Sequence, residues 1–208
     1  MKVFPTLSLL RLLCIGLLLS GCVHKSSRPL LSEDWQSHVK QLLPLQKWQL
    51  TGKLAVKVPN DGGSMSLLWQ QQPNEFSLNF SGPFGQNLLS IKSQGKTVTL
   101  SEPDHPPITA GSAEELIRRN TGWHIPVSQL TYWVRGLPDP TARVRTFETN
   151  SQGLPAQIEQ LDWKITYNEY MSVTTSAGAV SMPKRIIAEY KDIRLTMVIR
   201  EWQMEPVL

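Results

Sequence analysis

The chain has 208 residues, of which 40% are hydrophobic and 18% are charged. This balance is typical of a globular protein and excludes an intrinsically disordered one. The formal net charge of +4 is too small a surplus to indicate a nucleic-acid partner.

The first residues predict a bacterial lipoprotein signal. A charged start with Lys2 is followed, after Arg11, by an apolar stretch, and then by Leu19, two small residues and Cys22. Such a stretch is typical of a secretory signal and is too short for a membrane-spanning helix. The sequence Leu-Ser-Gly-Cys resembles the lipobox, which implies cleavage after Gly21, diacylglycerol on the Cys22 thiol and an acyl chain on the new amino terminus.

The lipid on Cys22 is the only covalent group that we expect, and no other cofactor is predicted. Two or three acyl chains hold a protein on a bilayer stably, whereas one chain anchors it only marginally. Retention at the inner membrane usually goes with aspartate after the lipidated cysteine, and here Val23 follows it. We therefore expect the outer membrane, facing the periplasm. The alternative is an ordinary secretory signal that ends in a cysteine by chance.

The mature chain is predicted to form one domain behind a short tether. Residues 22–31 are mainly polar and turn-prone, and residues 32–208 are long enough for a single domain with its own core. Cys14 and Cys22 are the only cysteines, so this domain has no thiol for a disulfide or a metal. Its stability therefore depends on core burial.

The domain begins with a predicted helix and continues as strands. In residues 32–43, Trp35, Val39 and Leu42 recur at helical spacing after Ser32, a plausible N-cap. Apolar side chains then alternate with polar ones, which is typical of half-buried strands. This alternation is found in residues 48–58, 65–69, 76–80, 89–91, 98–100, 161–167, 186–190 and 193–199.

Two further short helices are predicted between the strands. Ser112 and Glu115 have the spacing of a capping box, and Gly122 can end the helix that follows. A second helix is predicted to start at Pro126 and to stop at Gly136. Strands that follow one another without regular helices between them favour an antiparallel sheet. We therefore expect a mainly β fold, an open, curved antiparallel β-barrel of about 11 strands with a helical lid.

Residues for catalysis or metal binding are few. None of the four histidines has a second ligand type at metal spacing. Asp104 and His105 lie in a proline-rich loop, and no G-x-S-x-G motif accompanies them. We therefore predict no catalytic residue and no metal site. A membrane-anchored cell-wall hydrolase that uses Asp104 and His105 remains the alternative from another class.

One loop has an unusual composition for its place. Residues 81–86 put Phe84 between Pro83 and Gly85, at the tip of a turn between two predicted strands. Loop tips are usually polar and exposed. Phe84 either folds back over the edge of the barrel or protrudes toward a membrane or an acyl chain.

Seven stretches along the chain form a recognisable series. They are the lipobox that ends at Cys22, Trp48-Gln-Leu-Thr-Gly-Lys-Leu-Ala-Val, Ser66-Leu-Leu-Trp-Gln, Gly82-Pro-Phe-Gly, Gly122-Trp-His-Ile-Pro-Val, Tyr132-Trp-Val-Arg-Gly-Leu-Pro and Trp163-Lys-Ile-Thr-Tyr. Each stretch is weak alone, but their order over essentially the whole chain is specific. Together they resemble the LolB family, the outer-membrane lipoprotein receptors of Gram-negative bacteria.

The resemblance implies an open antiparallel barrel with a helical lid and an apolar cavity. It implies a monomer without enzymatic activity that accepts lipoproteins from the soluble periplasmic carrier LolA and places them in the inner leaflet of the outer membrane. The family's membrane-insertion loop matches Gly82, Pro83, Phe84 and Gly85. The resemblance therefore assigns the exposed apolar side chain of this loop to Phe84, where leucine is common in the family.

The acyl chains of the cargo lipoprotein are expected to bind in the apolar cavity. Alternation alone does not distinguish a cavity from a filled core. A carrier of another lipid, such as a glycolipid, is an alternative that the cavity does not exclude. The predicted lining, chosen from the apolar face of the early strands, consists of Trp48, Leu50, Leu54, Val56, Met65, Leu67, Trp69, Phe76, Leu78 and Phe80.

Overall fold

The computed structural model of the protein describes residues 33–176 and 178–205. The predicted signal and lipidated tether in residues 1–31, including Cys22, lie outside the described residues. The predicted helix cap at Ser32 lies outside them too.

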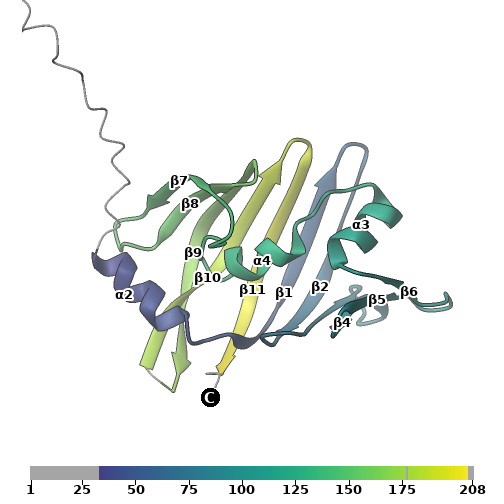
Figure 1. The fold of residues 1–208 in the computed structure, drawn as a ribbon, viewed down its shortest axis with the longest axis horizontal. Coiled ribbons are helices and arrows are strands. Elements are labelled where there is room, and N and C mark those ends of the chain that lie inside the picture. Colours follow the sequence, from purple (N-terminus) through teal and green to yellow (C-terminus); the bar gives the residue numbers. More distant parts are fainter. Residues whose placement is uncertain (1–32, 177, 206–208) are drawn as a thin grey trace, which may run out of the picture. The chain divides into compact units, whose positions relative to one another are not determined.

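One sheet of eleven antiparallel strands forms most of the described structure (Figure 1). The strand order is β6-β5-β4-β3-β2-β1-β11-β10-β9-β8-β7, so the first strand pairs with the last in the middle of the sheet. Strands β6 and β7 lie at opposite ends of this order, so the sheet stays open. The prediction of an open, mainly β fold of about 11 antiparallel strands is confirmed.

The strands form two consecutive meanders that meet at the β1–β11 pair. The first meander consists of β1 (Lys47–Val58), β2 (Asp61–Gln71), β3 (Phe76–Ser81), β4 (Asn87–Gln94), β5 (Thr97–Ser101) and β6 (Ile108–Ala110). The second consists of β7 (Val144–Thr149), β8 (Pro155–Gln160), β9 (Trp163–Thr175), β10 (Gly178–Tyr190) and β11 (Ile193–Glu205).

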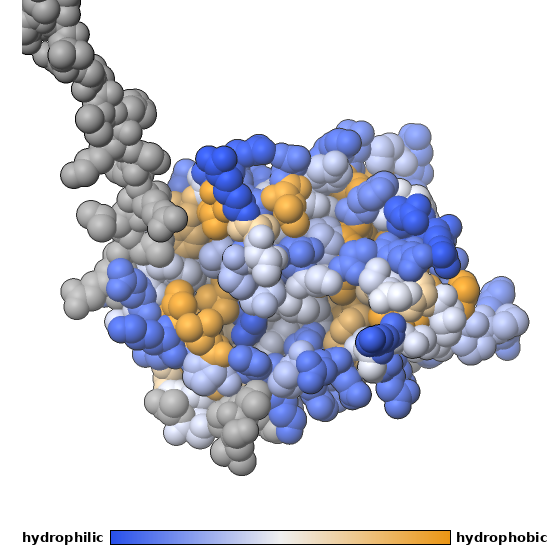
Figure 2. All heavy atoms as spheres, in the orientation of Figure 1, coloured by the Kyte–Doolittle hydropathy of each residue, from blue (hydrophilic) through white to orange (hydrophobic). Residues whose placement is uncertain are grey.

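Three helices accompany the sheet within the described residues: α2 (Glu33–Leu42), α3 (Ala113–Thr121) and α4 (Val127–Trp133). Figure 1 shows α3 and α4 across one face of the sheet, and α2 beside β9 and β10. We refer to α3 and α4 as the lid. The face that carries the lid is mainly polar, with hydrophobic side chains in separate patches (Figure 2).

Residues predicted from the sequence cap both ends of the lid helix α3. Ser112 Oγ accepts a hydrogen bond from the backbone N–H of Glu115 at 3.1 Å, and the Glu115 carboxylate accepts one from the backbone N–H of Gly111 at 3.2 Å. Gly122 ends the helix with a left-handed φ of 76°, and its N–H donates to the Arg118 carbonyl at 2.9 Å. The predicted start and stop of this helix are confirmed.

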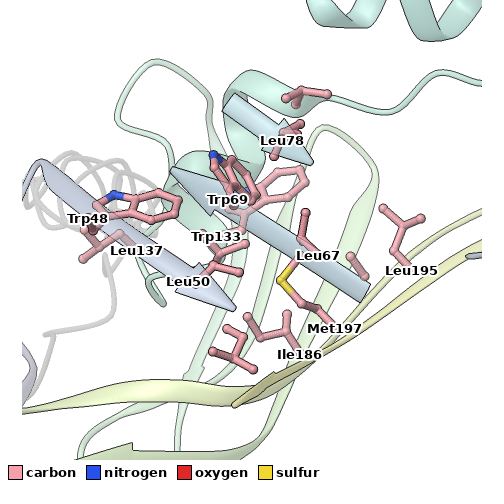
Figure 3. Packing of buried hydrophobic residues seen from close by; sticks show 14 of the residues in the cluster. Trp48, Leu50, Leu67, Trp69, Leu78, Trp133, Leu137, Ile186, Leu195 and Met197 are labelled. Atoms are coloured by element: carbon pink, nitrogen blue, oxygen red, sulfur yellow. The ribbon is translucent and has the colours of Figure 1, made fainter. Parts of the chain in front are cut away.

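Tryptophan side chains make up much of the core on the inner face of the sheet. Trp48 of β1 packs against Trp69 of β2 and Trp202 of β11, with ring centroids 5.2 and 5.4 Å apart. Trp133 of α4 is fully buried. Figure 3 shows Trp69, Trp133 and Leu67 in one cluster of apolar side chains.

The later part of the sheet differs from its sequence pattern in two places. Leu161 was expected at the start of a strand, but Leu161 and Asp162 form a turn with φ of 51° and 62°, and β9 begins at Trp163. Strands β7 and β8, which precede this turn, were not predicted. Asp162 tolerates a left-handed φ, but leucine is not a usual turn residue, so the sequence signal for a turn at Leu161 is weak.

Candidate functional site

An apolar cavity of about 210 Å³ lies between the sheet and the lid. Apolar side chains from both meanders and from the lid form nearly all of its wall, and the polar residues at it are Glu102, Asn120 and Thr121. A space lined in this way binds hydrocarbon and offers few groups for polar ligands.

Seven of the ten predicted lining residues border this cavity, and they come from β1, β2 and β3. They are Leu54, Val56, Met65, Leu67, Trp69, Leu78 and Phe80.

Trp48, Leu50 and Phe76 do not border the cavity. Trp48 and Phe76 are both in register with Gln71, so they lie at the same end of the sheet. There the Trp48 ring is packed by its tryptophan neighbours, and Phe76 borders a shallow polar depression. Leu50 is fully buried beside Trp48, so side chains fill this end of the sheet and leave no space (Figure 3).

The remaining wall of the cavity comes from residues that the prediction did not include. Strands β4, β5, β9, β10 and β11 and the residue after β5 contribute Leu89, Ile91, Leu100, Glu102, Ile165, Ile186, Ala188, Leu195 and Met197. The lid and its connecting loop contribute Ile117, Asn120, Thr121, Trp123, Ile125, Val127, Leu130, Trp133 and Val134. The apolar strand residues follow the same two-residue alternation, so the sequence already indicated that they face inward. Which lid residues face the cavity could be known only from the structure.

The loop between β3 and β4 presents Phe84 to solvent. The Phe84 side chain is 96% exposed, so it does not fold back over the sheet. The backbone N–H of Gly85 donates to the Gly82 carbonyl at 3.0 Å, and the N–H of Gly82 donates to the Gln86 carbonyl at 2.9 Å. Gly85 has a φ of 81°, which favours glycine. The Phe84 N–H donates to Gln86 Oε1 at 3.1 Å, so the loop orders itself with the aromatic side chain outward.

The lid is fixed to the sheet at the end of α4. Gln160 of β8 is 1% exposed. Its Oε1 accepts hydrogen bonds from Trp133 Nε1 at 2.9 Å and from the backbone N–H of Asp139 at 2.8 Å. Its Nε2 donates to the carbonyls of Asp139 and Ala142 at 2.9 and 2.8 Å. One buried amide therefore ties α4 and the chain after it to β8.

A buried tyrosine adds a second connection at the same place. The Tyr167 hydroxyl of β9 donates to the Trp133 carbonyl at 2.8 Å. Burial raises the pKa of Tyr167 well above its ordinary value, so this hydroxyl stays protonated and remains a donor.

The hydrogen bonds of α3 side chains connect parts of the lid with one another. The Glu114 carboxylate accepts from the backbone N–H of Ser128, at the start of α4, at 2.7 Å. Asn120 and Thr121 donate to carbonyls of α3 itself, each at 2.7 Å. The lid is thus coupled within itself and fixed at the α4 end.

The alternative catalytic pair lies in an exposed turn between β5 and β6. His105 Nδ1 is 2.9 Å from the Pro103 carbonyl oxygen and 4.0 Å from the Glu102 carboxylate. Within residues 33–176 and 178–205, no three His, Cys, Asp or Glu side chains are arranged to hold a metal ion. In the same part of the chain, no helix has the length and apolar character to cross a membrane.

The structure is a half-barrel: an open antiparallel sheet with an apolar cavity beneath a helical lid and an exposed aromatic loop. A cavity of this kind is suited to an apolar ligand. Among solved structures, this fold is similar to a LolA superfamily protein from Nitrosomonas europaea, with a TM-score of 0.50 and 10% identity over 83% of this chain and 94% of that one. A putative outer membrane lipoprotein-sorting protein domain from Vibrio parahaemolyticus has the same TM-score and identity, over 83% of this chain and 91% of its own.

The family follows from the sequence comparisons. Residues 46–202 match the family model of the outer membrane lipoprotein LolB, and the chain belongs to this family of outer-membrane lipoprotein receptors. It is 42% identical to the outer-membrane lipoprotein LolB of Cellvibrio japonicus, over 93% of this chain and 98% of that protein. It is 34% identical to the one of Chromohalobacter salexigens, over 90% and 86% of the two chains. The outer membrane is therefore its location.

Proposed function

We propose that this protein receives lipoproteins from a LolA-like periplasmic carrier, holds their acyl chains in the apolar cavity and inserts them into the inner leaflet of the outer membrane. Its own lipid on Cys22 anchors it to that leaflet. The observation that carries the proposal is a cavity with an almost wholly apolar wall beneath a helical lid.

The free-energy cost of exposing an acyl chain to water requires that the chain be transferred without passing through water. Exposure of a sixteen-carbon chain to water costs on the order of 12 kcal/mol at about 0.8 kcal/mol per methylene. Spontaneous release into the periplasm is therefore too unfavourable. The chain has to pass from the carrier's cavity to this one and then to the bilayer, and no energy source is needed if each site binds it better than the one before.

The cavity has to enlarge before it holds a whole lipid. Its volume of about 210 Å³ is below the roughly 300–1,000 Å³ that is typical of pockets for drug-sized ligands. The end of α4 is held by Gln160 and Tyr167, whereas α3 bonds within the lid. We therefore expect α3 and the loop after it to move away from β5 and β6, the strands that α3 contacts, when a chain enters.

The exposed loop supports the last step. An aromatic side chain that is 96% exposed on an ordered turn has no packing role in the protein itself. Burial of such a side chain in a bilayer contributes about 1.5–3 kcal/mol. Phe84 is thus suited to insert into the leaflet and to bring the cavity to the membrane surface.

A handover assay tests the proposal. The lipidated protein is reconstituted in vesicles and mixed with purified carrier loaded with a lipoprotein, and a photocrosslinker is placed at Met65 or, as the matched control, at Ser64 on the exposed part of the same strand. We expect adducts to the cargo acyl chains from Met65 and not from Ser64, followed by arrival of cargo in the vesicles. Equal adducts from both positions, or copurification of a glycolipid in place of lipoprotein, would contradict it.

A further inference from the structure

A β-bulge in β11 turns Arg200 toward the outer face of the sheet, away from the cavity. In the pairing of β1 with β11, Thr51 faces Glu201 and Gly52 faces Ile199, so Arg200 is an extra residue without a partner. Arg200 and Glu201 are consecutive exposed residues between the buried Ile199 and a buried tryptophan. Bulges break strand alternation in this way and redirect a side chain.

Gly52 permits the close approach of the two strands at the bulge. A Cβ atom at this position would lie 2.4 Å from the Val198 carbonyl oxygen, which is too short for any real contact. Gly52 belongs to the inner face of β1, together with Leu50 and Leu54, and Thr51 beside it belongs to the outer face. On that outer face, Arg200 borders a recess beside the bulge.

This recess, which we call the outer depression, has a volume of about 330 Å³. Its wall is made by β1, β2, β3, Arg200 of β11 and both ends of the loop that carries Phe84. Besides Arg200, it is lined by Thr51, Gly52, Ser66, Leu67, Leu68, Asn79, Phe80, Ser81, Gly85 and Asn87.

The charge of the outer depression is positive. It is lined by three hydroxyl side chains and two amides, and none of its residues is acidic. Within the described part of the chain, Arg200 forms no ion pair. Glu201 does not line the depression, and its Oε1 accepts a hydrogen bond from Gln203 Nε2 at 3.1 Å. A free guanidinium among hydroxyl and amide donors is suited to an anion with several oxygens.

We propose that the outer depression binds the phosphodiester headgroup of a membrane phospholipid while Phe84 is inserted in the bilayer. This inference rests on the membrane-insertion role proposed for Phe84. A side chain buried at the boundary of headgroups and acyl chains places the base of its loop at the level of the phosphates. Gly85 and Asn87, which follow Phe84 in the chain, line the depression together with Arg200, so a phosphate bound there lies beside the inserted loop.

The second contact has a consequence for delivery. One inserted side chain leaves the protein free to rotate about it, whereas an insertion point and a bound headgroup together define an orientation. Arg200 is on the face of the sheet opposite the cavity, so its contact with a headgroup limits how the cavity is presented to the leaflet.

The test uses the full-length lipidated protein in vesicles that contain phosphatidylethanolamine with a photoreactive headgroup. Lipid adducts on the Phe84 loop and on β11 are measured by mass spectrometry. The variant Arg200→Gln is compared with Arg143→Gln, which removes the same charge from an exposed residue outside the depression. We expect at least about fivefold fewer adducts for Arg200→Gln, because this variant loses a charge-assisted hydrogen bond to the phosphate, and no change for Arg143→Gln.

Asn87→Asp serves as a second variant, because it places a negative charge in the depression without changing Arg200 or the bulge. It is expected to lose adducts to a similar degree. Equal adducts for all four proteins would overturn the proposal, and so would competition by soluble glycerol phosphate, because the site would then take free phosphate. Adduct formation is measured without cargo. Failure of lipoprotein handover in the same vesicles would therefore count against the proposed function and not against headgroup binding.

Discussion

The two meanders of the sheet use the same strand pattern for different purposes. Buried hydrogen bonds from Gln160 and Tyr167 connect the second meander to the lid. Within this meander, the Tyr170 hydroxyl of β9 donates to the Pro155 carbonyl of β8 at 2.6 Å. The first meander contributes most of the cavity's strand residues and carries the exposed Phe84. Buried hydrogen bonds fix the geometry of the groups that form them, whereas apolar contacts are non-directional. We call the hydrogen-bonded side, which includes Gln160 and Tyr167, the frame; the other side surrounds most of the cavity.

The largest effect is expected from breaking the frame. Gln160→Leu removes four hydrogen bonds and leaves the Trp133 indole N–H and the Asp139 backbone groups without a buried partner. We expect the free energy of unfolding to fall by about 3–5 kcal/mol, measured by urea denaturation. Gln157→Leu, on the same strand but only half-buried, is the control and is expected to cost less than about 1 kcal/mol. Similar losses for both variants would contradict the frame.

The exposed loop is expected to matter for delivery and not for stability. Phe84→Glu removes an apolar side chain of about 1.5–3 kcal/mol in membrane affinity, so vesicle delivery in the handover assay should slow by about tenfold or more. The free energy of unfolding should stay within about 0.5 kcal/mol, because the side chain has no packing contacts to lose. Phe84→Leu retains the apolar character and should deliver at nearly the normal rate. Delivery by Phe84→Glu at the unmutated rate would refute this role.

Substitutions by larger side chains test whether a position borders empty space or closely packed core. Ala188 of β10 borders the cavity, whereas Val180 of the same strand lies in the core outside the cavity wall. Val180→Phe is expected to cost about 1–3 kcal/mol of stability through overpacking. Ala188→Phe is expected to cost less and to weaken binding of a fluorescent fatty acid, measured by titration. If Ala188→Phe destabilises the protein as much as Val180→Phe, the cavity is not available space.

The smallest effect concerns the pH dependence of α2. His38 is 7% exposed, and among residues 33–176 and 178–205 its Nε2 has no hydrogen-bond partner. Burial lowers its pKa below 6.5. The unfolded chain therefore binds a proton at a higher pH than the folded one, so stability is complete above about pH 6.5 and falls as the pH drops below that value.

His38→Phe removes this titration. Urea denaturation at pH 7.5 and 5.5 should give a loss for the unmutated protein that exceeds the loss for His38→Phe by up to about 1 kcal/mol. Equal losses would mean that His38 does not titrate between these pH values in either state.

Regular alternation made the first five strands of the first meander predictable, whereas the three-residue strand β6 was not predicted. The pattern from Trp48 to Leu100 gave the strands and the inward faces, and Ser112 with Glu115 gave the start of the first lid helix. The strand β8 was missed because it begins with Pro155, which argues against a strand, and ends with Gln160, a polar residue whose burial depends on partners far along the chain.

The sequence could not show which inward-facing residues border the cavity and which are packed in the core, and the reason is physical. Leu50 and Leu54 have the same side chain and lie on the same face of one strand, yet only Leu54 borders the cavity. The difference arises from what lies opposite, which is tryptophan packing at one end of the sheet and the lid over a space at the other. The bulge at Arg200 was hidden likewise, because an exposed arginine between strand residues looks the same with or without it.

The pairing of β1 with β11 has a consequence for how the protein matures. Lys47 lies beside Glu205, so the seam at the centre of the sheet joins segments that are nearly the whole domain apart. A secreted chain emerges with its amino-terminal part first, and its two meanders stay separate until the last strand has crossed the inner membrane. Until then the edge of β1 that β11 later covers is a free template for strand pairing with other chains.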